Sequence, residues 1–258
     1  MIATDAAEEA RKRIEPHGTW FPYLITGISL GGPLTLVCAE FLKKAPSVSP
    51  LPLDDWMKLF VVTPSIFVFL VLFQELMTSD GTIARRLSTL LIVSYAFFWG
   101  VNVSANSISN KYNKSSNVDS SSDLYHVIDF LDEVLSHQFT NLSIFAILFV
   151  WLYNAPPRQP APIAQQHACA AVGMLFGIGY AEVAVEGQTP VGALLGSAIL
   201  QLMVTFKARA VGPAASGDLL LKWLSWFSVT MLILLTSYGL YFGYFPEPSK
   251  LMKQMKHL

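Results

Sequence analysis

Long apolar runs separated by short polar segments dominate the pattern of this chain. A helix needs roughly 20 apolar residues to cross about 30 Å of hydrocarbon. Seven runs approach that length, at residues 21–42, 57–77, 87–106, 138–154, 167–185, 191–206 and 219–245. Their apolar positions are continuous rather than alternating, which favours helices over the strands of a membrane barrel. The pattern therefore predicts an all-α, polytopic membrane bundle with about seven transmembrane helices.

The run at 191–206 is the shortest of the seven and leaves an alternative open. It could be tilted, re-entrant or paired tightly with the run before it, so six crossings are possible. We expect a single bundle over 21–245, with a charged amphipathic lead at 1–20 and a basic tail at 246–258. Residues 107–123 are rich in Ser and Asn and are expected to form a mobile loop.

Composition supports a membrane protein and excludes one class of partner. Of the 258 residues, 53% are hydrophobic and 14% are charged, against about 25% charged residues in a soluble domain. The net charge of −1 argues against nucleic acid as a partner, and the lipid bilayer is the expected one. Lys and Arg are spread over both sides, so they do not set the orientation. The glycosylation sequon Asn113-Lys114-Ser115 favours a cytoplasmic N-terminus if that site is used.

Three glycine pairs are spaced four residues apart within the predicted spans. They are Gly27 and Gly31, Gly173 and Gly177, and Gly192 and Gly196. Such pairs let helix backbones approach closely where lipid offers no hydrophobic drive for association. They predict a compact bundle, and their faces could also hold partners in a larger membrane complex.

Polar residues collect on one side of the predicted bilayer. If the spans alternate in direction, Asn102 and Asn106 end the third span on the side opposite the N-terminus. The stretch HVIDFLDEVLSHQF leads the fourth span in from that side, and Glu182 and Glu186 end the fifth there. Ionisable groups within spans are rare and usually face the bundle interior, so this side is where we expect a functional site.

Four ionisable side chains of that stretch share one face of the predicted helix, within roughly 80° at about 100° per residue. They are His126, Asp129, Glu133 and His137. Asp132 is expected to point away from this face.

The spacing is suggestive of a metal site. Glu133 and His137 are one turn apart and can reach a common ion, as Glu/His pairs do in di-metal helix bundles. We expect His126 and Glu182 to complete the ligand shell, with Asn102, Asn106 and Glu186 as further contacts. Nitrogen and oxygen ligands suit a divalent Zn, Fe or Mn ion.

The first hypothesis for function is a membrane-embedded, metal-dependent enzyme acting on a lipid or other apolar substrate. The metal would lower the pKa of a bound water. Asp129 and Glu133 are the candidate catalytic residues, with Asp129 as base or as the group that orients a ligand histidine.

Three alternatives stay open. The carboxylates could bind a cation or relay protons in a transporter or channel. The chain could be a non-catalytic subunit of a membrane complex. The acidic residues could also be ordinary first-turn carboxylates of a helix that starts in water and is capped by Asp123, where the helix dipole favours negative charge.

Overall fold

The computed structural model describes residues 22–23, 25–27, 29, 53–78, 82–113, 122–155, 160–246 and 251, and within these ranges the side chains of all but 54–55, 110–113 and 133. Every regular element in these ranges is helical, which confirms the all-α prediction. The lead at 1–20 and almost all of the tail at 246–258 lie outside the described residues.

The elements follow one another as helices joined by short connections. They are α2 (Leu53–Met57), the π-helical η1 (Lys58–Val62), α3 (Thr63–Met77), α4 (Ile83–Asn113), α5 (Asp123–Asp129), the π-helical η2 (Phe130–Ser136), α6 (His137–Asn154), α7 (Ile163–Glu186), α8 (Pro190–Val211), the 3-10 helix η3 (Gly212–Gly217) and α9 (Leu219–Phe242). α5, η2 and α6 form one uninterrupted helical segment.

Six segments of the described chain are long and apolar enough to cross a membrane. They are Lys58–Met77, Ile83–Ser109, Asp123–Asn154, Ile163–Glu186, Pro190–Gly217 and Leu219–Phe242. The multi-pass membrane bundle is thereby confirmed. Most of the first predicted span, 21–42, lies outside the described residues, so the choice between seven and six crossings stays a prediction.

Two boundaries differ from the sequence-based expectation. The expected loop at 107–123 begins later, because α4 continues to Asn113. The serine hydroxyls at this end of α4 do not break the helix. Ser107 Oγ donates to the carbonyl of Val103 at 2.7 Å, a bond that a serine can make within its own helix. The short run at 191–206 lies within a helix of 22 residues, α8. α8 packs mainly against α9 and α6, so the tight pairing with α7 was wrong.

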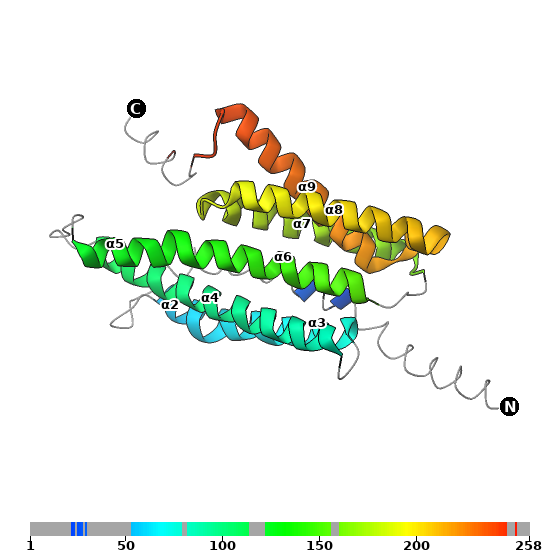
Figure 1. The fold of residues 1–258 in the computed structure, drawn as a ribbon, viewed down its shortest axis with the longest axis horizontal. Coiled ribbons are helices and arrows are strands. Elements are labelled where there is room, and N and C mark those ends of the chain that lie inside the picture. Colours follow the sequence, from blue (N-terminus) through cyan, green and yellow to red (C-terminus); the bar gives the residue numbers. More distant parts are fainter. Residues whose placement is uncertain are drawn as a thin grey trace.

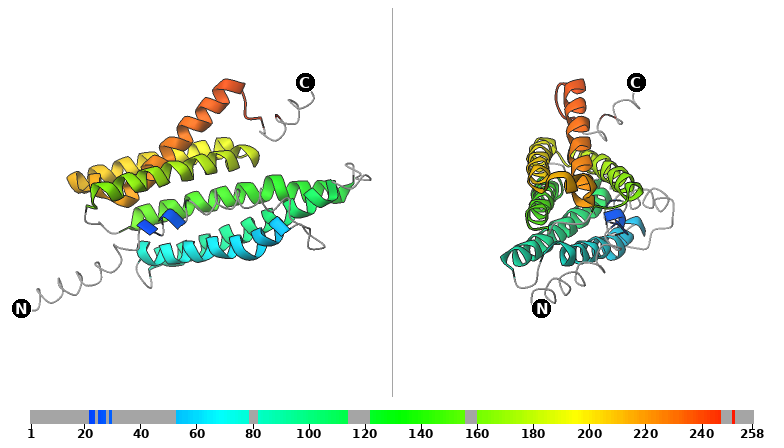
Figure 2. Two further views of the ribbon diagram at one scale, coloured as in Figure 1. Left: turned by 180° about the vertical axis from the view of Figure 1, so that it is seen from behind. Right: turned by 90° about the vertical axis from the view of Figure 1, so that its right-hand side faces the viewer.

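The helices form two layers (Figure 1; Figure 2). α3, α4 and α6 make up one layer, and α7, α8 and α9 make up the other. The layers meet chiefly where α6 packs against α8. The second half of α9 diverges from its neighbours (Figure 1), and no residue of α9 beyond Leu235 is buried.

Two tryptophans occupy the core and find partners for their indole N–H groups. Trp151 donates to Ser88 Oγ at 2.8 Å and Trp223 donates to Ser29 Oγ at 3.0 Å. The ring centroid of Phe73 lies 4.8 Å from that of Trp151 and 5.8 Å from that of Trp223. Because no water is available in hydrocarbon, such an acceptor stabilises each of these two buried N–H groups. The bond to Ser29 also brings the segment around residues 25–29 against α9.

One glycine pair forms a close backbone contact between two helices. A Cβ at Gly173 would lie 2.5 Å from the carbonyl oxygen of Trp223, and one at Gly177 would lie 2.8 Å from that of Phe227. These distances leave no room for a side chain, so α7 and α9 touch backbone to backbone. A Cβ at Gly192 would meet no atom within 4 Å. The first glycine of the third pair therefore makes no such contact within the described structure.

We expect Gly173→Ala to destabilise the bundle by about 1–3 kcal/mol, because the added methyl overpacks the α7–α9 contact. The measurement is the midpoint of unfolding of the purified chain in detergent. Gly192→Ala is the matched control. It should leave stability unchanged or raise it by up to about 1 kcal/mol, the helix-propensity gain of Ala over Gly. Equal losses in both variants would contradict the assignment of Gly173 as a contact residue.

Candidate functional site: a buried polar cluster between α4, α6 and the α7–α8 turn

The entry to the fourth crossing is not a regular α-helix. η2 is π-helical over Phe130–Ser136, and its i→i+5 hydrogen bonds put more than the usual 3.6 residues into a turn. The rotation of about 100° per residue therefore fails between Asp129 and His137. π-helical segments inserted into α-helices are frequent at functional sites.

The π-helical turn changes which side chains are buried. Asp132 is 5% exposed and Ser136 is 0% exposed, whereas His126 and Asp129 are exposed and His137 is half-buried. The burial of Asp132 differs from the exposure of His126 and Asp129, so Asp132 does not share their face. The predicted shared face of His126 and Asp129 with His137 is not seen in the burial pattern, because the π-helical turn lies between them and the prediction assumed a regular α-helix.

The amide of Asn102 on α4 connects this helix to the fourth crossing. Its Nδ2 lies 3.0 Å from Ser136 Oγ and 3.0 Å from His137 Nε2. The carbonyl oxygen of Asp132 lies 3.5 Å from the same nitrogen. Asn102 is therefore the point where α4 holds the start of α6.

The hydrogen-bond directions follow from the chain of donors. Ser136 Oγ donates to the carbonyl of Asp132, so it accepts from Asn102. The amide nitrogen that faces both Ser136 and the Asp132 carbonyl must be the NH₂ group, a donor. His137 Nε2 must then accept, which leaves the imidazole neutral with its proton on Nδ1.

The other edge of the His137 ring touches the turn between α7 and α8. A Cβ at Gly187 would lie 2.3 Å from His137 Nδ1, so only a glycine fits there. Asn141, one turn further along α6, donates to Thr189 Oγ1, and the turn closes through Thr189 N to the carbonyl of Ala184 at 2.8 Å. His137 thus lies between α4 on one side and the α7–α8 turn on the other.

The expected metal ligands do not converge within the described structure. No group of three or more His, Cys, Asp or Glu side chains lies close enough to hold an ion, among those described. The side chain of Glu133 lies outside that set. Glu182 is exposed, and no hydrogen bond or ion pair joins it to His137 among the described residues. The expected pairing of Glu182 with His137 is therefore not formed.

The remaining expected contacts lie at the margin of the cluster. Of the two asparagines of α4, Asn102 belongs to it, while the side chain of Asn106 is exposed. Glu186 is half-buried at the end of α7. Of the expected site residues whose side chains the structure describes, His137 and Asn102 are joined by a direct contact.

The alternative that the acidic residues are ordinary carboxylates at the start of a solvated helix explains part of the stretch from His126 to Phe139. The helix begins at Asp123, and its N-cap is Ser122, whose side chain accepts from Tyr125 N at 3.2 Å. Asp129 therefore lies beyond the first turn, although its exposure fits a solvated carboxylate. The burial of Asp132 and the contacts of His137 do not fit that alternative.

Four residues of the cluster were missed from the sequence. They are Ser136, Asn141, Gly187 and Thr189. A signal for the first two was present in SHQFTN, where polar residues at 136, 137, 140 and 141 recur one turn apart within an apolar run. Gly187 and Thr189 gave no such signal, because a turn of this composition is ordinary.

No family model matches this chain, and no curated protein and no solved structure matches it. The site stands on geometry alone.

A double-mutant cycle tests the contact between Asn102 and His137. Asn102→Ala, His137→Ala and the double variant should give a coupling energy of about 0.6–1.7 kcal/mol in favour of the pair, the range for hydrogen bonds between membrane helices. The measurement is unfolding of the purified protein in detergent micelles.

Asn106→Ala combined with His137→Ala provides the control cycle, because Asn106 is on the same helix and exposed. Its coupling should be close to zero. Coupling of equal size in both cycles would show that the loss of stability comes from a general loosening of α4 and not from the contact between Asn102 and His137.

Proposed function

We propose that this chain is a proton-coupled cation transporter in which the protonation of His137 controls its bond to Asn102 inside one helix layer, beside the α7–α8 turn of the other layer. The observation that carries the proposal is the position of the His137 ring. Its Nε2 lies 3.0 Å from the amide nitrogen of Asn102 in one layer, and its opposite edge lies against Gly187 of the other. An ionisable residue inside a membrane bundle is a functional candidate by default, and proton relays are among its commonest uses.

A second proton on His137 would be incompatible with the hydrogen bonds of the cluster. It would turn Nε2 into a donor facing the donor amide of Asn102. The amide would not relieve this by rotating, because Asn102 Oδ1 would then face the carbonyl oxygen of Asp132, now 3.5 Å from the nitrogen. Proton uptake would therefore break the bond between Asn102 on α4 and His137 on α6.

The architecture offers a motion that such a break could drive. His137 belongs to the layer of α3, α4 and α6 and touches the turn between α7 and α8 of the other layer (Figure 1). Rocking of one helix bundle against another is a common route to alternating access in transporters. A proton bound more tightly in one arrangement shifts the population toward that arrangement.

Carboxylates on the surrounding elements would supply the proton and attract the cation. They are Asp129 and Asp132 on the same crossing as His137, and Glu182 and Glu186 on α7. Asp129 and Glu182 are exposed, so they add negative potential at this end of the bundle. Such a potential raises the local concentration of cations.

A metal-dependent enzyme is the weaker candidate. Of its expected ligands, His126 and Glu182 have exposed side chains and do not converge on His137. A metal at this site stays a prediction that depends on the side chain of Glu133. A non-catalytic role gains no specific support from the cluster.

The test is proton movement in liposomes that contain the purified chain and a trapped pH-sensitive dye. An imposed Na⁺ or K⁺ gradient should change the internal pH faster than in protein-free vesicles. His137→Gln should reduce the rate to that of protein-free vesicles, because glutamine can accept from Asn102 but cannot exchange a proton.

His126→Gln is the matched control, since His126 is on the same crossing and exposed. It should transport at the wild-type rate. Wild-type vesicles that behave like protein-free vesicles under both gradients would overturn the proposal, and so would equal losses in the two histidine variants.

A further inference from the structure

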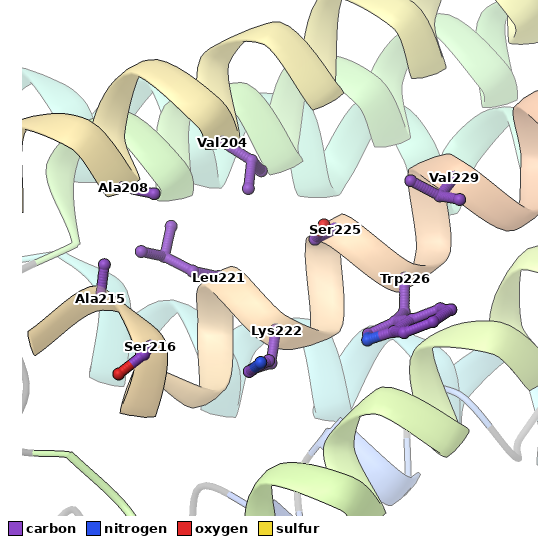
Figure 3. Close-up of a pocket in the computed structure, with 9 residues that line it drawn as sticks. All are labelled: Val204, Ala208, Ala215, Ser216, Leu221, Lys222, Ser225, Trp226 and Val229. Atoms are coloured by element: carbon purple, nitrogen blue, oxygen red, sulfur yellow. The ribbon is translucent and has the colours of Figure 1, made fainter. Parts of the chain in front are cut away.

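A groove lies at the opposite end of the bundle, where α8 ends and α9 begins. Its volume is about 330 Å³, and it lies between α8, η3 and α9. Figure 3 shows Val204 and Ala208 on α8 facing Leu221 on α9, while Lys222 and Trp226 project from the other side of the α9 ribbon in this view. The walls are mostly apolar, and Lys222 is the charged residue among those that line it.

We infer that this groove binds an anionic phospholipid, with its phosphate at Lys222 and part of an acyl chain along Val204, Leu221 and Trp226. The site is separate from the polar cluster, and the inference does not depend on the proposed transport. The volume is at the lower end of the range of about 300–1,000 Å³ for small-molecule sites. It therefore suits one chain of a lipid rather than a whole lipid molecule.

Lys222 is an available cation at this end of α9 among the described residues. It lies in the first turn and is half-exposed. Asp218, four residues earlier, is 7% exposed, and its Oδ1 accepts from the backbone N–H groups of Leu220 and Leu221 at 2.8 and 3.1 Å. That carboxylate serves as the N-cap of α9. The Lys222 ammonium makes no hydrogen bond or ion pair in the described part of the chain.

Lys207 on α8, unlike Lys222, is bonded within the protein. Its ammonium donates to the carbonyls of Leu152 and Ala155, the latter at 3.0 Å, and so satisfies the end of α6. Lys207 therefore has a structural role at the same end of the bundle. Lys222 has no such role, which leaves its charge for a ligand.

Charge complementarity selects the occupant. A lysine at the end of a membrane helix above an apolar groove matches an amphiphile with a negative head and an apolar chain. Basic pockets between membrane helices bind lipid head groups in this way, and lysine is a common phosphate partner. Trp226 is 41% exposed beside Lys222, and an indole suits the boundary between head group and chain.

The experiment is native mass spectrometry of the full chain with added phosphatidylglycerol or phosphatidylcholine, which differ in net charge. Wild-type protein should retain phosphatidylglycerol preferentially. Lys222→Gln should lower that retention by about fivefold, the effect of removing one lysine near a lipid surface. Lys222→Arg should preserve it, which shows that the loss does not come from misfolding.

Matched controls separate charge, shape and head group. Arg209→Gln removes an exposed charge from α8 outside the groove and should have no effect. Ala208→Phe should fill the groove and reduce retention, whereas Ala210→Phe, at an exposed position, should not. Inorganic phosphate should not displace the lipid, because it cannot occupy the apolar walls.

Equal retention of the two lipids by the wild type would overturn the inference. Equal losses in Lys222→Gln and Arg209→Gln would do the same. Displacement by inorganic phosphate would assign Lys222 to a free anion and remove the lipid from the proposal.

Discussion

The structure depends on one constraint: a polar group inside hydrocarbon must find its hydrogen-bond partner within the protein. Apolar side chains cannot specify which helices meet, because lipid tails are as apolar as leucine. Several side-chain pairs between segments of the described structure meet the constraint, and four of them lie at key contacts. They are Trp151 with Ser88, Trp223 with Ser29, Asn102 with His137 and Asn141 with Thr189. Each pair joins two segments far apart in the sequence, so these bonds fix which segments lie side by side.

The contacts between helices differ in whether a titratable group takes part in them. The α7–α9 contact is backbone against backbone at Gly173 and Gly177, and no titratable group takes part in it. One of the contacts between α4 and α6 passes through His137, whose hydrogen-bond pattern changes with one proton. The layer of α7, α8 and α9 is therefore suited to behave as a unit, while one contact inside the other layer depends on a titratable ring. Closely packed interfaces tend to have discrete arrangements rather than a continuous range, which is the property that a transporter requires.

Apolar run length was enough to predict the helical class and the approximate place of six described crossings, because a bilayer imposes its thickness on every helix. The face of the fourth crossing was not predictable in the same way. A regular helix was assumed, and the π-helical turn at Phe130–Ser136 buried Asp132 and exposed His126. Glu182 was placed at the right end of the bundle but on the wrong side of α7, because depth follows from sequence position whereas direction depends on packing. Gly187 could not be recognised, since its role arises only when the His137 ring lies against it.

The choice of asparagine at position 102 is consistent with a histidine that changes its charge. An aspartate there would favour the imidazolium, because the attraction between opposite charges is strong at low dielectric, and breaking such a buried pair is costly. An apolar residue would leave Nε2 without a donor, and burial alone would favour the neutral imidazole. The amide of Asn102 stabilises neutral His137 by a single hydrogen bond, worth about 0.6 kcal/mol on average between membrane helices. A bond of that size can be broken by one proton, so the cluster is held firmly enough to order the helices and weakly enough to be switched.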